Sequence, residues 1–412
     1  MTLLLRAVEA MGEGDVATDA PVATNASSPR EWITRRNVLR GVAAATVAGI
    51  GGYAAITARR PPPRPPEVEA LLGQAWQAWT QGDRAGSEQA IGLYRRATVV
   101  APDDPDTWGL LGCVNADLAH WAPAAERPAL RQRAQEAGRR ALNIDRRNAF
   151  GRMAVAYARP IRGNWLLMER EFRQAISDQP RKWLGPYSLA LLLTRTGRNS
   201  EAAELFEGVR QVAPTAMQYL FHIQALWAIG RLDEAERLLG EAIPIYGTHP
   251  AIWLTKFKIL LSSGKAETAS TLVENRQDRP AGFDGDALRI PLLVADAAAN
   301  RDEAAIGRVV SELSQSARRS SSASEAAIEY ASLLGRVDEA FEMANAYYFF
   351  RGYAVPDTAM ASDVTLESRD TRFLFLPTTS RLRGDARFES MVKEIGLDQF
   401  WRRSRQPDYR LG

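Results

Sequence analysis

A turn of similar composition recurs along this chain at a spacing close to 34 residues. Each turn is Gly or Asn followed by a polar residue, and a small or apolar residue stands five positions later, at turns beginning with Gly163, Gly197, Gly230, Gly264, Asn300 and Gly335. The steps between these turns are 34, 33, 34, 36 and 35 residues. This period is typical of a helix–turn–helix unit that cannot bury its apolar face alone, so that neighbouring units must stack. The repeat therefore predicts an all-α, stacked architecture for most of the 412 residues.

The residues around each turn keep a common register. Small residues recur where two helices would cross closely, large residues recur where gaps between layers must be filled, and proline ends the second helix. Counted from Gly197, these places hold Leu189, Ala190, Ala202, Phe206 and Pro214. The register resembles the tetratricopeptide repeat (TPR). The resemblance implies a right-handed superhelical TPR solenoid of about eight helix–turn–helix repeats over residues 68–354.

Two further repeats are found upstream when insertions are allowed. After Gly82 the pattern arrives three residues late, at Ala90 and Tyr94. Residues 108–112, which read Trp-Gly-Leu-Leu-Gly, match the start of the next repeat, and its second helix is also delayed. The extra residues around 121–128 predict a protruding loop or two longer helices.

The N-terminal residues carry a different signal. Residues 1–33 are expected to be a disordered tail. Arg35 and Arg36 then precede an uncharged stretch from Gly41 to Ala58, whose 18 residues just reach the length of a membrane span. Residues 34–60 resemble a bacterial twin-arginine export signal, although Val38 stands where that family has Phe.

The same segment has three interpretations: a retained twin-arginine-like signal, an ordinary signal anchor with a single transmembrane helix, or a buried soluble helix. No small-x-small cleavage pattern precedes Arg59, which favours retention as an anchor. We expect an inner-membrane anchor, a Pro-rich linker at 61–67, and a periplasmic solenoid. Arginines flank the stretch on both sides, so a cytoplasmic orientation stays open.

The period is lost in the C-terminal residues 355–412. Residues 382–388 read Leu-Arg-Gly-Asp-Ala-Arg-Phe, and a Gly-Leu pair and Phe400-Trp401 follow. This ending resembles that of bacterial TPR modules found downstream of winged-helix regulators or adenylate cyclases. Because a terminal repeat must cover its apolar end face, we expect a helical cap on the last repeat. Its apolar residues would be Phe388, Met391, Ile395, Leu397, Phe400 and Trp401.

Composition and motifs give no support to catalysis. The chain has one Cys and three His, too few and too scattered for a zinc site, and no metal or cofactor is expected. Phosphate-binding, metalloprotease and nucleophile-elbow motifs do not occur. With 52 basic and 49 acidic residues, the chain has no marked basic excess, so we expect no nucleic-acid partner.

The resemblance to TPR proteins implies a concave groove lined by the first helix of each repeat. In that family, certain positions of the first helix point into the groove. Mapped onto this chain, those positions hold Trp76, Trp79, Tyr157, Tyr187, Gln224, Trp227 and Lys258. This set is aromatic and carries few charges, which favours an apolar or extended peptide as ligand. The competing interpretation is that several of these aromatic residues only pack between repeats.

Two functions are compatible with these features. The first is a non-catalytic protein–protein interaction scaffold, tethered to the membrane by its N-terminal segment, with a peptide or protein partner in the groove. The alternative is an orphan sensory module that acts with a separately encoded transcription regulator or cyclase.

Overall fold

The structure is a computed structural model, and it describes residues 64–82, 84–212, 215–280, 285–357, 365–367 and 369–411. The expected tail at 1–33 and the twin-arginine-like segment at 34–60 lie outside these residues. The chain divides into two compact units, Met1–Ala70 and Leu71–Gly412. Only residues 64–70 of the first unit are described, and all contacts given below lie within the second. Among the described helices, none is both long and apolar enough to cross a membrane.

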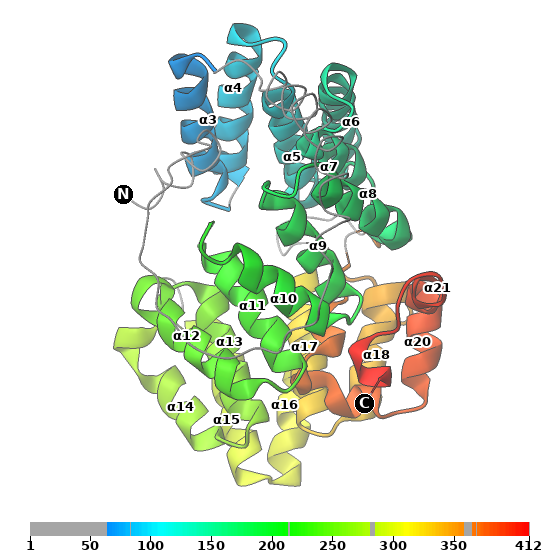
Figure 1. The fold of residues 1–412 in the computed structure, drawn as a ribbon. Helices are drawn as coiled ribbons and strands as arrows, with labels where there is room; N and C mark the ends of the chain where they lie inside the picture. Colours follow the sequence, from blue (N-terminus) through cyan, green and yellow to red (C-terminus); the bar gives the residue numbers. More distant parts are fainter. Residues whose placement is uncertain are drawn as a thin grey trace, which may run out of the picture. The chain divides into compact units, whose positions relative to one another are not determined.

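Helices and short turns make up the regular structure of the described residues, in which no strand occurs (Figure 1). Along the chain, α3–α18 fall into eight consecutive pairs, the number expected from the repeat. Their bounds are α3 (Pro66–Trp79), α4 (Arg84–Val100), α5 (Pro105–Trp121), α6 (Arg127–Ile144), α7 (Ala149–Tyr157), α8 (Trp165–Asp178), α9 (Leu184–Arg195), α10 (Asn199–Val209), α11 (Ala216–Ala228), α12 (Leu232–Tyr246), α13 (Pro250–Ser262), α14 (Ala266–Glu274), α15 (Gly285–Asn300), α16 (Glu303–Ser316), α17 (Ser321–Leu333) and α18 (Val337–Phe349). A single 3₁₀ turn, η1 (Arg276–Asp278), follows α14.

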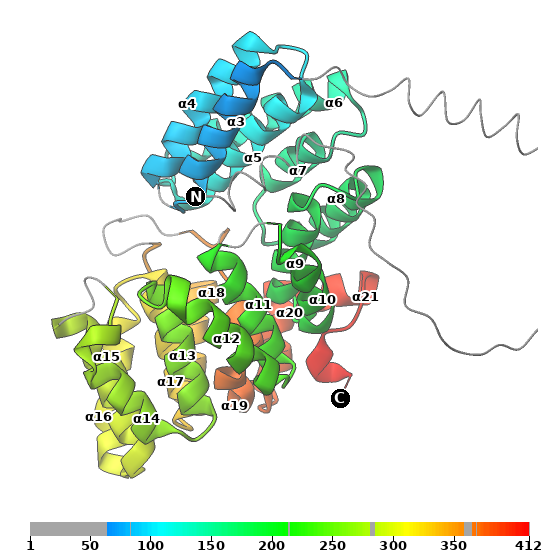
Figure 2. The same cartoon turned by 60° about the vertical axis from the view of Figure 1, so that its left-hand side comes forward.

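Successive pairs pack as the TPR register requires. From α5 onward the two helices of each pair contact each other, and the first helices α5, α7, α9, α11 and α13 also contact one another in order. The first helices of the eight pairs, from α3 to α17, form what we call the inner face. Figure 2, turned by 60° from Figure 1, shows α11, α13 and α17 beside one another. The structure thus has the tetratricopeptide-like stacking that the repeat predicts.

The predicted turns are the points where the backbone needs a left-handed conformation. At six turns a glycine has φ between +73° and +85°, a region that glycine adopts without a Cβ penalty. These residues are Gly82, Gly163, Gly197, Gly230, Gly264 and Gly335. The alanines five positions after the last four, Ala202, Ala235, Ala269 and Ala340, are fully buried, as the register predicts.

The repeat between α15 and α16 is one residue out of the predicted register. We placed its turn at Asn300, but the residue with positive φ is Arg301, at +55°. The buried place five residues later is therefore Ile306 and not Ala305, which stays half-buried. Asn tolerates positive φ better than Arg does, so composition alone pointed to the wrong residue.

The second pair carries the insertion as longer helices and not as a protruding loop. Its helices α5 and α6 have 17 and 18 residues. Glycines allow α5, α6 and α7 to approach closely: a Cβ at Gly112 would lie 2.6 Å from the Cβ of Ala154, and one at Gly138 would lie 2.8 Å from the carbonyl oxygen of Gly151. The close approach explains why these helices contain glycines, which weaken an isolated helix.

The chain turns back on itself after α18. Residues 369–411, which we call the return segment, contain η2 (Arg372–Phe375), η3 (Pro377–Thr379), α19 (Ser380–Arg383), α20 (Arg387–Ile395), α21 (Leu397–Arg403) and η4 (Asp408–Arg410). The first three contact α17, and α21 contacts α8 of the third pair. The return segment therefore joins repeats far apart in the sequence.

This arrangement differs from a simple end cap. The six apolar residues assigned to the cap are all buried. Trp401, however, donates a hydrogen bond from its indole Nε1 to the carbonyl oxygen of Thr196, at 2.8 Å, in the turn between α9 and α10. The amide of Asp408 donates to the carbonyl of Gly197 at 2.9 Å. The segment thus covers the fourth pair as well as the last one.

The glycine contacts predict opposite effects for two Gly→Ala changes. Gly112→Ala should lower the free energy of unfolding by roughly 1–3 kcal/mol, because its new Cβ must push α5 away from α7. Gly240→Ala on α12 should raise it by about 0.5–1 kcal/mol, because its Cβ meets nothing within 4 Å and alanine favours the helix. Urea denaturation measures both. Equal stability of Gly112→Ala and the wild type would contradict the close packing.

Candidate functional site

The aromatic residues expected in the groove of the first repeat lie together with one that the sequence did not single out. The Trp76 ring is 5.7 Å from the Trp79 ring and 4.9 Å from the ring of Trp183, centroid to centroid. Trp183 precedes α9 and lies 5.9 Å from Tyr187. We call Trp76, Trp79, Trp183 and Tyr187 the aromatic cluster. All four are half-buried, so each keeps some surface for a ligand.

Tyr157, on α7, lies apart from this chain of ring contacts. It packs against a small core of Ala116, Ala134 and Ala158, and its ring lies 4.9 Å from Phe172. Tyr157 is half-buried. Its contacts fit packing between helices, as the competing interpretation of the sequence proposed.

One carboxylate lies at the aromatic cluster. Asp117 projects from α5, and its Oδ2 accepts a hydrogen bond from the indole Nε1 of Trp79 at 2.8 Å. Burial raises the pKa of the Asp117 carboxyl, and the Trp79 hydrogen bond offsets part of that increase. The charge of Asp117 also contributes to the raised pKa of Tyr187, although burial is the larger cause.

The remaining three groove residues have other environments. Trp227 is only 3% exposed, which leaves it little surface for a ligand. The side-chain amide of Gln224 donates to Thr255 Oγ1 at 3.4 Å, on the neighbouring first helix. Lys258 Nζ forms an ion pair with Glu329 at 2.5 Å. The seven predicted residues are therefore not one continuous surface.

The return segment occupies the inner face beside these last residues. Thr371 Oγ1 donates to the carbonyl of Arg195, at the end of α9, over 2.5 Å. The Arg372 guanidinium lies 4.3 Å from the centroid of the Phe221 ring on α11. Thr378 Oγ1 donates to Glu329 Oε2 on α17 at 2.7 Å. Arg195 Nε also lies 3.7 Å from Asp370 Oδ1. Side chains of α9, α11 and α17 are thus already engaged by the chain itself.

Charged groups are buried where the return segment meets the inner face. Burial alone would raise the pKa of Asp370, but the guanidiniums of Arg372 and Arg195 outweigh it and hold that pKa well below its usual value. Glu325, on α17, accepts a hydrogen bond from the hydroxyl of Tyr347 at 2.5 Å. Burial, together with the charge of Asp370, raises the pKa of Glu325 to about 7.

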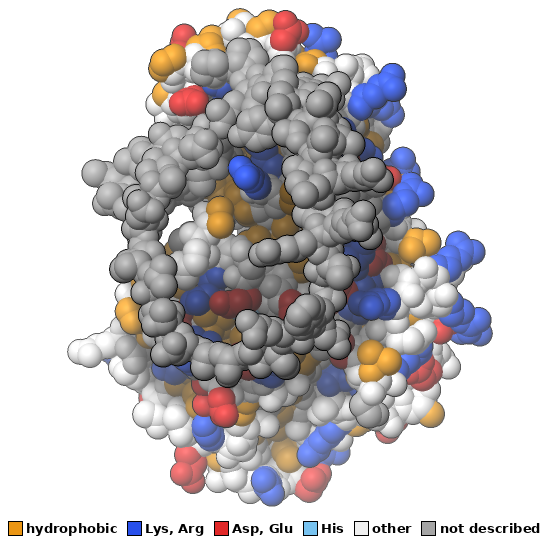
Figure 3. Space-filling model, in the orientation of Figure 1, with side chains coloured by type: hydrophobic (Ala, Val, Ile, Leu, Met, Phe, Trp, Pro, Cys, Tyr) orange, Lys and Arg blue, Asp and Glu red, His pale blue; other side chains and the backbone are white. Residues whose placement is uncertain are grey.

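Sequence reasoning missed this charged network for a definable reason. Residues 371–377, which read Thr-Arg-Phe-Leu-Phe-Leu-Pro, lie outside the repeat, and its period gives no information on which helix covers them. Asp370 and Arg372 lie on either side of Thr371, and their spacing matches no sequence motif that would mark them as a charged network. Figure 3 shows hydrophobic, acidic and basic side chains on the part of the face in view that is not drawn in grey.

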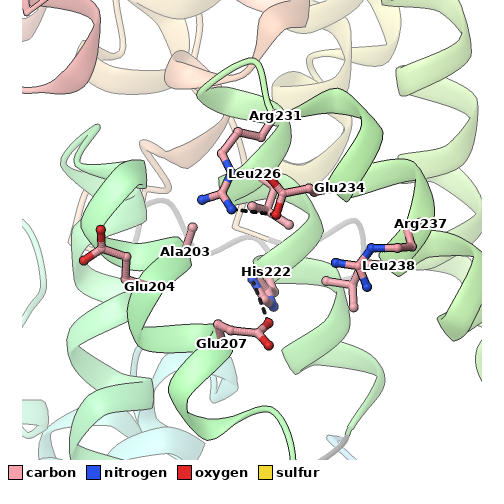
Figure 4. A pocket seen from close by; sticks show the side chains of 9 residues that line it. All are labelled: Ala203, Glu204, Glu207, His222, Leu226, Arg231, Glu234, Arg237 and Leu238. Carbon is pink, nitrogen blue, oxygen red and sulfur yellow. Dashed lines mark hydrogen bonds and ion pairs between the residues drawn. The ribbon is translucent and has the colours of Figure 1, made fainter. Parts of the chain in front are cut away.

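A second recess lies between α10 and α12 (Figure 4). It has a volume of about 430 Å³ and is lined by Ala203, Glu204, Glu207, His222, Leu226, Arg231, Glu234, Arg237 and Leu238. His222 Nε2 lies 3.9 Å from Glu207 Oε2, and burial lowers the pKa of His222 to about 4. Arg231 pairs with Glu234 at 2.5 Å, and Arg237 pairs with Glu241 at 2.8 Å. Arg231, Glu234 and Arg237 therefore each have a partner within the fold.

The described residues offer little for metal or thiol chemistry. Within them, no group of three or more His, Cys, Asp and Glu residues is placed to hold a metal ion. Cys113 is buried, and its Sγ lies 3.4 Å from the carbonyl oxygen of Phe150. Burial raises the pKa of the Cys113 thiol, which disfavours the reactive thiolate.

Comparisons with known proteins give only distant similarities. No family model and no curated protein sequence matches this chain. A thermophilic TPR protein of Thermus thermophilus, TTC0263, is 18% identical, with a TM-score of 0.36 over 47% of this chain and 99% of that chain. A tetratricopeptide repeat protein from Parabacteroides merdae ATCC 43184 is 16% identical, with a TM-score of 0.37 over 60% and 91%. Yeast Tom70 is 14% identical, with a TM-score of 0.38 over 80% and 68%.

At these identities and TM-scores, we infer nothing about ligands or partners from the three structures. The repeat architecture of this chain rests on its own positive-φ turns and on the fully buried alanines of its register.

The raised pKa of Glu325 predicts a pH-dependent stability. A Glu in an unfolded chain has a pKa near 4.3, roughly. The pKa of Glu325 is higher in the folded chain. The stabilisation from a protonated Glu325 is therefore complete below the unfolded-state pKa and is lost as the pH rises through about 7. As the pH rises from acidic to mildly alkaline, the free energy of unfolding of Glu325→Gln should therefore increase by on the order of 2 kcal/mol relative to that of the wild type.

Urea denaturation of both chains over that pH range measures this difference, and groups that titrate in both chains cancel. Glu267→Gln, an exposed change on α14, should follow the wild type at every pH. A stability difference between Glu325→Gln and the wild type that does not vary with pH would contradict the assignment.

Proposed function

We propose that this protein is a non-catalytic interaction scaffold that binds an extended peptide or protein segment at the aromatic cluster. The observation that supports the proposal most is the contrast along the inner face. From α9 to α17 the return segment already engages its side chains, whereas the aromatic cluster keeps four half-buried rings and a carboxylate. Large aromatic rings that keep exposed surface are the usual anchors of protein interfaces.

The chemistry of the side chains favours binding over catalysis. Buried thiol and imidazole groups, here Cys113 and His222, are held in neutral forms. The strongly shifted carboxyls Glu325 and Asp370 contact Tyr347 and Arg372 within the fold. Such buried networks serve to fix a chain in one arrangement, and perturbed pKa values alone do not make a catalytic site.

The membrane tether is part of the same proposal. Arg35 and Arg36, followed by the uncharged residues 41–58, support an anchor retained in the inner membrane of a bacterium. The proline-rich residues 61–66 would then act as a spacer, and the solenoid would lie in the periplasm.

Affinity capture with matched variants tests the scaffold. The full chain, tagged at its C-terminus, is recovered from solubilised membranes together with its partner. Trp183→Ala removes one of the four rings of the aromatic cluster. The change should reduce partner recovery by at least about tenfold, as loss of an aromatic hot spot does. Ile245→Ala, at a residue of α12 that is 65% exposed, is the control and should retain the partner.

Undiminished recovery with Trp183→Ala would place the partner elsewhere and overturn the proposal. Both variants should show the helical circular dichroism of the wild type, which separates lost binding from lost folding. The same fractionation tests the tether, because recovery of the bait in the soluble fraction would contradict it.

A further inference from the structure

Asp117 is an acid without a cationic partner among the described residues. The hydrogen bond from Trp79 Nε1, at 2.8 Å, engages one carboxylate oxygen. Among the side chains that the structure describes, which do not include that of His120, no Lys, Arg or His nitrogen lies within the 4.0 Å of an ion pair from this carboxylate. A carboxylate with restricted access to water gains stability from any cation that reaches it.

Other acids of the same region are matched by the fold. Asp106, at the start of α5, pairs with Lys182 Nζ at 2.6 Å. Asp370 pairs with Arg372, and Glu329 pairs with Lys258. The fold therefore supplies a cation to each of these three acids, whereas Asp117, like Glu325 of α17, forms no ion pair among the described residues.

The aromatic cluster gives this site a second attraction for positive charge. Trp76 and Trp79 stand nearly perpendicular to each other, at 82°, and Trp183 makes an edge contact with Trp76 at 74°. Ring faces of Trp and Tyr attract cations, and Trp is the strongest of the natural side chains in this respect. A group that carries positive charge at the end of an apolar stem would meet both the rings and the carboxylate.

We propose that Asp117 and the aromatic cluster bind a basic side chain, Lys or Arg, of the partner peptide. The inference rests on the proposed scaffold function and specifies the chemistry of its ligand. The aliphatic stem of that Lys or Arg side chain lies along the indoles of Trp76 and Trp183, and its charged end reaches the carboxylate of Asp117. Charge complementarity thus selects the partner, while the aromatic rings supply contact area.

Two short peptides that differ in one charge test this inference on the full chain. The probes are acetyl-Ala-Ala-Lys-Ala-Ala-amide and its norleucine analogue, which keeps the stem and lacks the ammonium. Fluorine NMR of the protein labelled with fluorotryptophan reports binding, and the Trp79 resonance is assigned by its loss in Trp79→Phe. The lysine peptide should shift that resonance with at least about tenfold higher affinity than the norleucine peptide, at concentrations up to ~10 mM.

Three variants separate charge from structure. Asp117→Asn keeps an acceptor for the Trp79 indole but removes the charge, and should abolish the preference for lysine. Asp117→Glu retains the charge and should retain the preference. Asp103→Asn, at an exposed acid in the turn before α5, should bind both peptides as the wild type does.

Three outcomes would overturn the inference: equal affinity of the wild type for the two peptides, no shift with either peptide, or a lysine preference that persists in Asp117→Asn. The scaffold proposal is judged separately. If both peptides bind equally and Trp183→Ala weakens both, the aromatic cluster is a peptide site without charge selection. If the capture experiment instead shows no dependence on Trp183, the scaffold proposal itself fails.

Discussion

The indole of Trp401 donates a hydrogen bond to the carbonyl of Thr196 across 205 residues of sequence, and the rest of the structure depends on the contact that it marks. Trp401 is 1% exposed, so the bond is made in a region that excludes water. Beside it, Arg198 donates to Ser404, and Ser404 donates to Glu169. A stack of repeats usually holds together through neighbours alone, but here the last residues fasten the third and fourth pairs to the eighth.

This closure determines which part of the inner face is open to a ligand. Before Trp401 reaches Thr196, the return segment contacts the end of α9, then α11 and then α17, through Thr371, Arg372 and Thr378 in turn. The peptide groove expected from the repeat is therefore occupied in this region by the chain's own backbone and side chains. The surface that we propose for a partner is the aromatic cluster, where Asp117 has no ion-pair partner among the described residues.

Local features of the fold could be predicted because they repeat. Gly197, Gly230 and Gly264 each mark a turn that needs positive φ, and the fully buried Ala202 and Ala235 follow from the same count. The error in the register of the turns, Asn300 in place of Arg301, arose where a residue poorly suited to positive φ occupies the turn. The position of the return segment could not be predicted. The repeat period reflects contacts between neighbouring repeats and gives no information on contacts between residues two hundred positions apart.

The candidate site was predictable in part for the same reason. Trp76, Trp79 and Tyr187 followed from inward places of the register, but Trp227 holds such a place and is buried. Trp183 precedes its helix and so falls outside the places that were counted. Asp117 has no motif, and its significance comes only from the absence of a cation around it among the described residues in three dimensions.

Amide hydrogen exchange at Ser200 tests the closure most directly. Its backbone N–H donates to the Asp408 carboxylate at 2.9 Å, although 208 residues separate the two in sequence. If the return segment is held on the α9–α10 turn by Trp401, Trp401→Ala should speed exchange at Ser200 by at least about tenfold, while amides of α14 exchange as in the wild type. Unchanged exchange at Ser200, with faster exchange confined to residues 387–411, would show that the fourth pair does not depend on the return segment.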